Sequence, residues 1–250
     1  MKEEIVTLSE DNLHNYRTFC GLSGRYLEGN RQKSEWLKER FREGLRYKIY
    51  QVNGQKAGFI EYTPGEYAWR GVDAKGYLFI HCLWVIGKNR GHGYGRKLLE
   101  DCWKDAKDYY GVAVVVSTTH WLPTPKLFLK NGFEVVDHAL PSFDLLVKRN
   151  FADAPLPRFK KNWHKANQYS KGLTFIKSAQ CPYAYVMDDG IRKIGEELNI
   201  PVNIMESKKT SEAQKLPCAY GVMGLYYNGE LLTYHPTNRK KILELLKAGM

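Results

Sequence analysis

The sequence predicts an α/β protein with two domains, and three features carry that prediction. Strand-like and helix-like stretches alternate over residues 1–150, which we expect to form the first domain. Prolines and basic residues then mark a linker over residues 151–171, and a second alternation of strands and helices occupies residues 172–250. Such alternation is typical of α/β folds. A chain of 250 residues is long enough to bury two cores of this kind.

The first domain opens with local signals for a strand, two helices and a hairpin. The expected elements in order are the strand EIVTLS, helices over Asp11–Cys20 and Ser34–Gly44, and the strands YKIYQVNG and KAGFIEYT. Asn53-Gly54 separates the last two strands, and this dipeptide is typical of a tight hairpin turn. We therefore expect an antiparallel pair of strands at this point.

A long apolar strand and a glycine-rich loop lie at the centre of the first domain. The further elements are the strand YLFIHCLWVI, a helix with apolar residues spaced from Leu98 to Tyr110, the strand VAVVVSTT, the short helix TPKLFLKNGF, and the strands EVVDHAL and FDLLVKR. VAVVVSTT is apolar on both faces, which suits a central strand covered on both sides. Gly132 is placed to end the short helix, as a C-terminal glycine does.

The linker over residues 151–171 is rich in positive charge. Its basic residues include Arg158, Lys160, Lys161, Lys165 and Lys171, and within it no acidic residue follows Asp153. Such a run indicates either a solvated linker or a basic collar for a phosphate or an acidic partner. The second domain then follows as the strand LTFIKS, a helix from Cys181-Pro182 to Leu198, the strand PVNIMES, a hairpin turning at Asn228-Gly229, and the helix NRKKILELLKAG.

Composition and cysteine spacing limit the classes of function. The formal charge of +11 favours an anionic partner, such as nucleic acid, an acidic surface or a phosphorylated cofactor. The five cysteines are widely spread without a CxxC motif, so we expect neither a disulfide framework nor a metal site, and a reducing cytoplasm fits best. The amino-terminal segment lacks the apolar core of a signal peptide, and no apolar run approaches the roughly 18 residues of a membrane span.

The stretch WVIGKNRGHGYGRKLLE places four glycines between the long strand and a helix. It lacks the Lys-Ser or Lys-Thr of a Walker A loop, and a dinucleotide fingerprint would need a glycine where Arg96 stands, so both are excluded. The first turn of a helix has unpaired N–H groups and a positive dipole end, and glycines remove the Cβ atoms that would keep an anion away. The loop therefore predicts a phosphate site, with a turn that binds nothing as the alternative. Its members are Arg90, Gly91, His92, Gly93, Tyr94, Gly95 and Arg96.

Two motifs together resemble the GNAT N-acetyltransferase superfamily. The run from Val85 to Gly95, followed by Leu98-Leu99, resembles that family's acyl-CoA loop, R/Q-x-x-G-x-G/A after a long strand. The run from Phe128 to Glu134 resembles its second landmark, a helix end before Gly-Phe. The resemblance covers residues 3–149. It implies a GNAT fold, which is a mixed, splayed sheet with helices on both faces, and acetyl-CoA as the acyl donor.

The resemblance also implies where the donor and the catalytic groups lie. The pantetheine arm would pair with strand backbone at Leu83 and Val85, and the pyrophosphate would lie on the amides of residues 91–96. An amine would attack the thioester directly, with a strand amide near Val85 polarising the carbonyl. His81 is the candidate general base, in a placement that resembles the histidine of serotonin N-acetyltransferases. The alternative for His81 is a core histidine with a satisfied hydrogen bond.

Two departures from the family pattern concern the leaving thiolate and the pantetheine. Many relatives carry a tyrosine that protonates the CoA thiolate, whereas this sequence has Phe128 at that position. Tyr94 or a water molecule is the expected substitute. A frequent asparagine of the family is replaced by Trp121, with His120 beside it, so contacts to the pantetheine are expected to differ.

The second domain resembles thioredoxin-like domains and, as a whole, the YoaP-like C-terminal family. Cys181-Pro182-Tyr183-Ala184 follows a strand and opens a helix, as the CPYC turn of thioredoxin-like domains does. The second cysteine is absent and Gly221 stands where a cis-proline is expected, so a dithiol cycle within this motif is excluded. A helix start favours a thiolate, which makes Cys181 a candidate thiol site, with Cys218 as a resolving partner. The alternative is an inert remnant of a reused fold.

The leading function is therefore acetyl transfer from acetyl-CoA to an amine of a small molecule or peptide. The alternative is a CoA-binding or thiol-sensing protein without efficient turnover, which the missing tyrosine would permit. Nucleic-acid binding would account for the positive charge but does not explain the glycine loop, so we disfavour this function.

Overall fold

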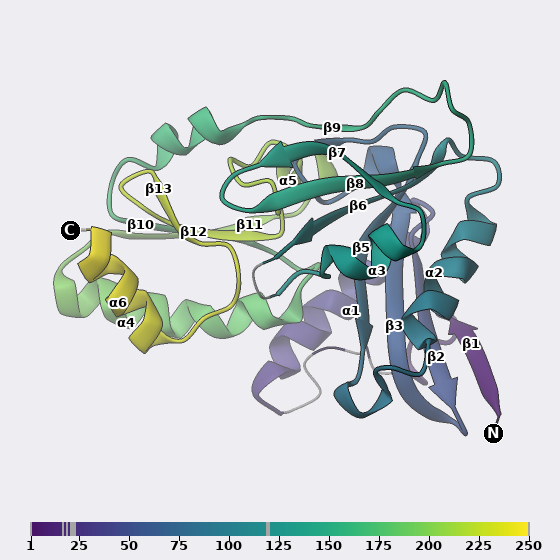
Figure 1. Cartoon of the computed structure of the whole chain (residues 1–250). Helices are drawn as coiled ribbons and strands as arrows, with labels where there is room; N and C mark the ends of the chain where they lie inside the picture. The colour runs from purple at the N-terminus through teal and green to yellow at the C-terminus, as the bar shows by residue number, and fades with distance from the viewer. Residues whose placement is uncertain (1, 17, 19, 21–23, 119–120, 250) are drawn as a thin grey trace. The chain divides into compact units, whose positions relative to one another are not determined.

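The computed structural model describes residues 2–16, 18, 20, 24–118 and 121–249, and the chain divides into two compact units (Figure 1). Unit 1 comprises residues 1–19, 37–68 and 72–159, and unit 2 comprises residues 20–36, 69–71 and 160–250. Unit 2 thus includes two segments from the amino-terminal half of the sequence. The domain boundaries at residues 150 and 172 stay predictions.

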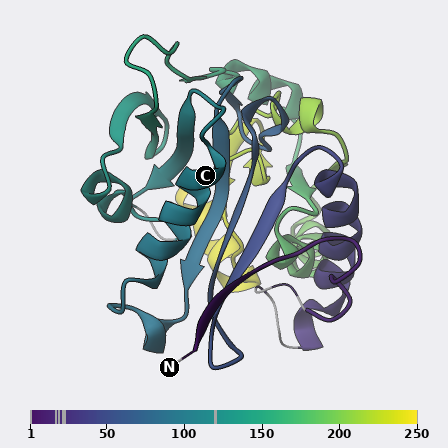
Figure 2. The same cartoon turned by 90° about the vertical axis from the view of Figure 1, so that its right-hand side faces the viewer.

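Unit 1 is built on a seven-stranded mixed sheet with the strand order β1-β2-β3-β5-β6-β8-β7. Its strands are β1 (Glu3–Thr7), β2 (Arg46–Val52), β3 (Gln55–Pro64), β5 (Leu78–Val85), β6 (Gly111–Ser117), β7 (Glu134–Ala139) and β8 (Phe143–Arg149). Helix α2 (Tyr94–Asp105) lies on one face of the sheet, and the last turn of α1 (Leu27–Phe41) lies on the other (Figure 2). The shorter elements are η2 (Gly65–Tyr67), η3 (Gly87–Asn89), α3 (Pro125–Lys130) and a small sheet of β4 (Val72–Asp73) with β9 (Arg158–Phe159).

The sheet of unit 1 opens between β5 and β6. These two strands are the one parallel pair in the described sheet, and their pairing runs only from Leu78 opposite Val112 to Ile80 opposite Val114. Beyond Ile80, the rest of β5 has no ladder partner on that side among the described residues. The predicted mixed, splayed sheet with helices on both faces is therefore confirmed.

Apolar periodicity explains why α2 packs where it does. Leu98, Leu99 and Cys102 bury one face of α2 against Ile80 and Leu83 of β5, in one contiguous core. The predicted helix register is confirmed over these residues. The hairpin between β2 and β3 is confirmed as well, because Asn53 and Gly54 have φ of 49° and 75°, the left-handed conformation that this turn requires.

Three predicted elements of unit 1 were wrong in extent. Residues 11–16 form turns instead of a helix, because the Asn12 side chain donates to Thr7 O and accepts from the Ser9 N–H and so fixes a local turn. Residues 17 and 19 of that predicted helix lie outside the described part of the chain. Helix α1 begins at Leu27, well before the predicted Ser34, and α2 ends at Asp105, before Tyr110.

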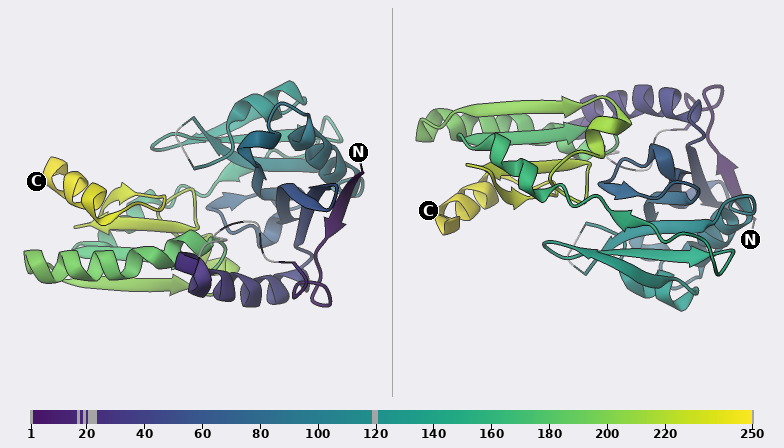
Figure 3. Two further views of the ribbon diagram at one scale, coloured as in Figure 1. Left: turned by 90° about the horizontal axis from the view of Figure 1, so that it is seen from below. Right: turned by 90° about the horizontal axis from the view of Figure 1, so that it is seen from above.

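Unit 2 is built on a four-stranded sheet in the order β11-β10-β12-β13. Its strands are β10 (Leu173–Ser178), β11 (Val202–Ser207), β12 (Met223–Tyr227) and β13 (Glu230–Thr233), and only β10 and β11 are parallel. Helices α4 (Asp188–Leu198) and α6 (Arg239–Gly249) cover one face, and η4 (Trp163–Tyr169) covers the other (Figure 3). The sheet-containing α/β architecture is confirmed, and the thioredoxin-like description stays a prediction.

One element of unit 2 differs from the sequence expectation. The helix after Cys181 starts as a 3₁₀ segment, η5 (Pro182–Met187), and becomes α-helical only at Asp188. The basic segment 151–171 contains the short elements β9, in unit 1, and η4, in unit 2. The remaining elements are η1 (Gly24–Tyr26) and α5 (Thr210–Ala213). None of the helices in the described residues has the length and hydropathy needed to span a bilayer.

A buried cluster of charges joins α2 to the sheet of unit 1. Lys48 Nζ of β2 lies 2.5 Å from Asp101 Oδ2 and 2.9 Å from Asp105 Oδ2 of α2. Tyr62 of β3 donates its hydroxyl to Asp105 at 2.5 Å. Burial raises the pKa of Asp105, but the hydrogen bonds from Tyr62 and Lys48 outweigh it and hold the pKa below its ordinary value.

Replacing Lys48 with Met is expected to destabilise unit 1 by about 3 kcal/mol, because the partly buried Asp101 loses its cation and Asp105 keeps only the more exposed Arg46. The folded-state pKa of Asp105 lies below its unfolded value. The stabilisation that ionised Asp105 provides is therefore fully present at pH values above the ordinary aspartate pKa of ~3.9. It is lost as pH falls through the lowered pKa. Urea unfolding at pH 7 and pH 2 should therefore show a large difference from the wild type at pH 7 and a small one at pH 2.

The matched control is Lys107→Met, because the Lys107 side chain is 78 % exposed and its ion pair with Asp108 spans 4.0 Å. This variant is expected to change stability by less than about 0.5 kcal/mol at either pH. Equal stability of the two variants at pH 7 would contradict the structural role of the Lys48 cluster.

Candidate functional site

The unpaired edge of β5 presents backbone groups to the gap between β5 and β6. The Ile86 N–H donates to Ala57 O on the β3 side at 2.9 Å. Because backbone groups of an antiparallel strand alternate in direction, the N–H and C=O groups of Val85 and Leu83 point the opposite way, toward the gap. The two residues predicted to meet an extended ligand therefore both offer backbone hydrogen-bonding groups there.

The glycine loop owes its path to backbone conformation. Gly91 and Gly93 have φ of 84° and 78°, a left-handed conformation that residues with a Cβ rarely adopt. A Cβ on either glycine would meet no other protein atom within 4 Å. These glycines are therefore required by their dihedral angles, and they leave open space beside the loop.

The loop ends at a helix start that no side chain caps. Gly93 is the N-cap residue of α2 and has no side chain to bond the first-turn amides of Tyr94, Gly95 and Arg96. Such amides, together with the positive end of the helix dipole, form an anion-binding site. The structure thus brings the open edge of β5 and the start of α2 to the two ends of one short loop.

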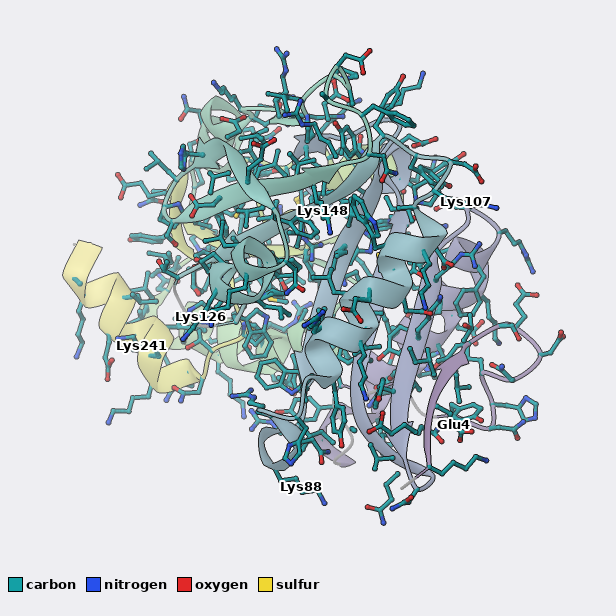
Figure 4. All side chains as sticks on the ribbon, turned by 45° about the vertical axis from the view of Figure 1, so that its right-hand side comes forward. Glu4, Lys88, Lys107, Lys126, Lys148 and Lys241 are labelled. Atoms are coloured by element: carbon teal, nitrogen blue, oxygen red, sulfur yellow. The ribbon has the colours of Figure 1, made fainter. Side chains whose placement is uncertain are left out.

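Cationic side chains surround this loop. Arg90 Nε donates to Val85 O at 3.2 Å, and its guanidinium lies 4.6 Å from the ring of Trp84, which ties the loop to the end of β5. The Arg96 side chain pairs with Glu100 at 2.7 Å, so the backbone N–H of Arg96 is the group left for an anion. Lys88 projects outward from η3 (Figure 4). His92 Nδ1 lies 3.1 Å from Arg90 O, and the imidazole is exposed.

Tyr94, the candidate acid for the leaving thiolate, packs its ring against strand β2. Its buried ring stacks on Tyr50 of β2 with the ring centroids 4.8 Å apart, and His92 stacks on it at 5.6 Å. Strand β2 lies two strands away from β5, and each strand spacing is about 4.8 Å. The backbone N–H of Tyr94 is part of the candidate site, and a role of its hydroxyl as an acid stays a prediction.

His81 lies where the sheet opens, and it is paired with a carboxylate that the sequence analysis missed. His81 Nδ1 is 3.1 Å from Glu61 Oε1 of β3, and both side chains are buried. Glu61 is opposite Cys82 and Tyr62 is opposite Ile80, so His81 is the extra residue of a β-bulge. One sequence signal could have found Glu61, because it is the only acidic residue in the apolar strand KAGFIEYT.

The second family landmark lies beside the same gap. Phe128 of α3 is fully buried against Phe133, with ring centroids 5.3 Å apart, and it offers no proton. Leu127 of α3 would be 3.4 Å from a Cβ on Gly95, so α3 packs against the start of α2. Trp121 has a φ of 98°, and His120 lies outside the described residues.

A cavity of about 360 Å³ lies at the same edge of the sheet as the glycine loop. Strand β6 runs parallel to β5, and Ser117 at its end pairs with Phe143 of β8, which places the β7–β8 turn at this edge. Thr118, Leu140 and Ser142 contribute to the wall. His138 Nδ1 lies 2.7 Å from Asp144 Oδ1, so the cavity also carries a carboxylate.

In unit 2, Cys181 lies at the N-cap of η5 under the start of α1. A Cβ on Gly29 of α1 would lie 2.1 Å from Pro182 O, so only glycine permits this approach. Tyr26 contacts Tyr183 edge to face at 4.7 Å. Cys181 is accordingly 9 % exposed.

The surroundings of Cys181 and its candidate partner Cys218 are largely buried. Lys177 Nζ, four residues before Cys181, pairs with Asp188 Oδ2 at 2.5 Å, so its charge is matched by a carboxylate. Cys218 is buried, and burial raises the pKa of its thiol to about 11. Gly221, at the expected cis-proline position, has a φ of 66° and packs against Arg70. In the residues that the structure describes, no group of three His, Cys, Asp or Glu side chains could hold a metal ion.

Two known families match the chain. The family described as Acetyltransferase (GNAT) domain matches residues 43–135, which span β2, β3, β5, the glycine loop, α2, β6 and α3. The family described as YoaP-like matches residues 201–244 in unit 2. The two matches account for the GNAT and YoaP-like resemblances found in the sequence.

Individual proteins are similar to the chain over most of their length. The N-acetyltransferase YoaP of Bacillus subtilis (strain 168) is 29 % identical over 246 residues, covering 96 % of this chain and 97 % of that protein. The PaiA N-acetyltransferase of Thermoplasma acidophilum in complex with coenzyme A is 20 % identical with a TM-score of 0.44, covering 60 % of this chain and 99 % of its own. An acetyltransferase of Thermus thermophilus is 16 % identical with a TM-score of 0.46, covering 60 % and 97 %.

Among the five cysteines, Cys181 is expected to react fastest with iodoacetamide near neutral pH, because it alone begins a helical segment. Cys102 and Cys218 are expected to be slowest, since burial raises the pKa of both thiols. Labelling of the folded chain over a pH series, followed per cysteine by mass spectrometry, measures the order. Faster labelling of the half-buried Cys20 or Cys82 would leave the buried Cys181 as a packing residue.

Proposed function

We propose that this chain, an N-acetyltransferase with a GNAT domain followed by a YoaP-like region, transfers an acetyl group from acetyl-CoA to the amine of a small molecule or peptide. The observation that carries the proposal is the pairing of an open β5 edge with an uncapped helix start across one glycine loop. Acetyl-CoA has the two matching parts, which are an extended arm with amide groups and a pyrophosphate.

The described residues offer groups that match such a donor, although Val85 O also accepts a hydrogen bond from Arg90 Nε. The backbone of Leu83 and Val85 offers hydrogen bonds to the amides of the arm, as an added strand would receive them. The amides of residues 91–96, with the dipole of α2, favour the pyrophosphate. Open space beside Gly91 and Gly93 leaves room for its oxygens. The nearby Lys88 and Arg90 add positive charge.

The proposed reaction is a direct attack of the amine nitrogen on the thioester carbonyl carbon. His81 takes one proton from the nitrogen, and the carbonyl oxygen becomes an oxyanion near the amide of Val85. The oxyanion then reforms the carbonyl, the carbon–sulfur bond breaks, and the CoA sulfur leaves as a thiolate that takes a proton from solvent. The buried Phe128 cannot donate that proton, and Tyr94 is the alternative donor to solvent.

The cavity at the β7–β8 turn is the proposed entrance for the acceptor. It lies at the edge of the sheet where β5 ends, and the Asp144 carboxylate offers an opposite charge to a protonated amine. Thr118 and Ser142 add hydrogen-bonding groups to the wall. This lining favours a polar amine of small size or the end of a peptide.

A second candidate function is CoA binding without efficient turnover. The observation that favours it is Phe128, which occupies the place of the family's usual acid and cannot donate a proton. Release of free CoA in the presence of an amine separates the two functions, because a binding protein would retain acetyl-CoA unchanged.

The donor site is tested by Gly93→Val, which is expected to weaken CoA binding at least about tenfold, since charge-assisted hydrogen bonds contribute about 1.5–3 kcal/mol each. Valine disfavours the left-handed conformation at residue 93 and places methyl groups beside the first-turn amides. Calorimetry with CoA measures the affinity, and circular dichroism checks the fold. Gly87→Ala is the matched control, because this loop glycine has no positive φ and a Cβ there meets open space. Equal CoA affinity in both variants would contradict the site.

Turnover is tested with the wild type and His81→Ala against a panel of amines, aminoglycosides, polyamines and peptides, followed by release of free CoA. His81→Ala is expected to lower turnover by about 10²–10⁴-fold, as loss of a general base does, and to remove the acidic limb of the pH–rate profile. CoA affinity should stay unchanged. A loss of only severalfold with the limb retained would assign the proton to water or to another group.

A further inference from the structure

Strand β11 forms one edge of the sheet in unit 2 (Figure 3). The N–H of Leu173 donates to Pro201 O at 2.8 Å, so the carbonyl of Pro201 points toward β10. Because the backbone groups of successive strand residues point in opposite directions, the N–H and C=O groups of Val202, Ile204 and Glu206 point away from β10. Among the residues that the structure describes, none of these outward backbone groups has a hydrogen-bond partner.

The edge at β11 is longer and more regular than the edge at the other side of the same sheet. β11 pairs with β10 through six consecutive residues, from Val202 to Ser207, without a shift of register. β13 has four residues, and its register with β12 shifts between Leu225 and Tyr226. Short and irregular edge strands resist the addition of another strand, whereas a regular edge offers a template for it. β11 is therefore the edge of this sheet that suits an added strand.

The side chains along β11 also suit a strand with alternating residues. A Cβ on Gly195 of α4 would lie 2.2 Å from Val202 Cγ2, so Val202 faces α4. Because side chains alternate along a strand, Asn203 and Met205 lie on the opposite face. Both are exposed, Met205 to 41 %. An apolar side chain of an added strand can pack beside Met205, as neighbouring side chains on one face of a sheet do.

A cluster of lysines lies where β11 ends and α5 begins. Its members are Lys160, Lys161, Lys208, Lys209 and Lys215. α5 makes a single turn, so its two ends are only about 6 Å apart. Lys160 Nζ donates to Gln214 Oε1 at 2.7 Å, and Asn162 Nδ2 donates to Gln214 O at 2.9 Å, which places the basic linker beside the end of α5. All five lysines are exposed, and none has an ion pair with a described residue.

Few carboxylates offset the charge of this lysine cluster. Glu212 of α5 accepts hydrogen bonds from the backbone N–H groups of Lys208 at 2.8 Å and Lys209 at 3.2 Å, so the start of the helix holds its side chain. Glu206 of β11 accepts the Tyr185 hydroxyl at 2.6 Å. In the sequence, basic residues outnumber acidic ones by eight in unit 2 and by three in unit 1. Most of the formal charge of +11 therefore belongs to unit 2, and it favours an anionic partner for that unit.

We propose that unit 2 binds an acidic, extended peptide segment of a partner protein, which adds to β11 as a further strand of the sheet. The peptide backbone pairs with the outward groups of Val202, Ile204 and Glu206. Its carboxylates lie beside the lysine cluster, where charge-assisted hydrogen bonds are available. This inference concerns unit 2 and does not depend on the proposed acetyl transfer.

Two other occupants fit these observations less well. A second copy of the chain would add its own segment from Val202 to Lys209, which has more lysines than carboxylates and so lacks the acidic character that the cluster favours. A nucleic-acid strand would match the lysines, but it lacks the regular backbone N–H and C=O groups that continue a β-ladder. An acidic peptide satisfies both the backbone edge and the charge.

Binding of a synthetic peptide to the full chain tests the proposal. The probe is a fluorescent seven-residue peptide of alternating glutamate and valine, and anisotropy is expected to give a Kd below about 100 μM at low salt. Ile204→Pro removes one outward N–H and no bond to β10, and edge strands tolerate proline at such a position. This variant is expected to bind at least about fivefold more weakly. Ile204→Val, which keeps the N–H, is the matched control, and circular dichroism checks the fold.

A modified peptide keeps the test independent of how the variant folds. The same peptide with every backbone nitrogen methylated retains its side chains and charge but cannot donate hydrogen bonds to β11. It is expected to bind the wild type at least about tenfold more weakly. Equal affinity for the two peptides would contradict strand addition, because charge alone would then account for binding.

The lysine cluster is tested by Lys208→Glu combined with Lys209→Glu. This double variant is expected to bind the glutamate peptide at least about tenfold more weakly, and binding to the wild type should weaken as salt is raised. Lys240→Glu combined with Lys241→Glu is the matched control. It changes the net charge by the same amount at exposed lysines of α6, which packs against α4 and β13.

Other results would overturn the proposal. A peptide of alternating lysine and valine that binds as tightly as the glutamate peptide would remove the argument from charge. Dimerisation that Ile204→Pro abolishes, measured by sedimentation velocity, would assign the edge to a second copy. Tighter binding of an oligonucleotide that Ile204→Pro leaves unchanged would assign the lysines to nucleic acid. No binding of the glutamate peptide at about 1 mM would leave the lysines as residues that keep the edge from aggregating.

Discussion

The separation of β6 from β5 after Ile80 is the constraint on which the candidate site depends. A sheet interior normally uses every backbone N–H and C=O in its ladders, so an extended ligand has nothing to bind there. Ending one ladder after three residue pairs leaves the outward backbone groups of Leu83 and Val85 outside the β5–β6 ladder, while β3 still holds the strand in place. The rigid side of β5 thus positions the open side.

The other parts of the site are arranged around this open edge. The glycine loop continues directly from β5. The short loop after Val85, which includes η3, therefore connects the open edge of β5 to the amides at the start of α2. The core formed by Leu98, Leu99 and Cys102 fixes α2 against the sheet, and the Lys48 cluster adds charge pairing on the same face. Packing and electrostatics therefore fix the helix at whose start the glycine loop ends.

In unit 2, the Cys-Pro-Tyr turn takes part in packing as well as carrying the candidate thiol Cys181. Gly29 brings the backbone of α1 onto Pro182, and the Tyr26–Tyr183 contact continues that packing. The burial of Cys181 and Cys218 follows from contacts with segments distant in sequence. A motif that resembles an active-site turn can thus also contribute to packing within the same unit.

The sequence by itself determined the features that arise from neighbouring residues. Strand and helix periodicity, the Asn53-Gly54 turn and the glycine loop are local signals, and the structure retains each of them. The limits of α1 and α2 were less predictable, because helix ends depend on capping and packing contacts. The bulge at His81, its pairing with Glu61, the stacking of Tyr94 on Tyr50 and the cover over Cys181 were decided only by the tertiary structure. The physical reason is that strand register and side-chain contacts join residues far apart in the chain, and no local pattern encodes which partner will lie opposite.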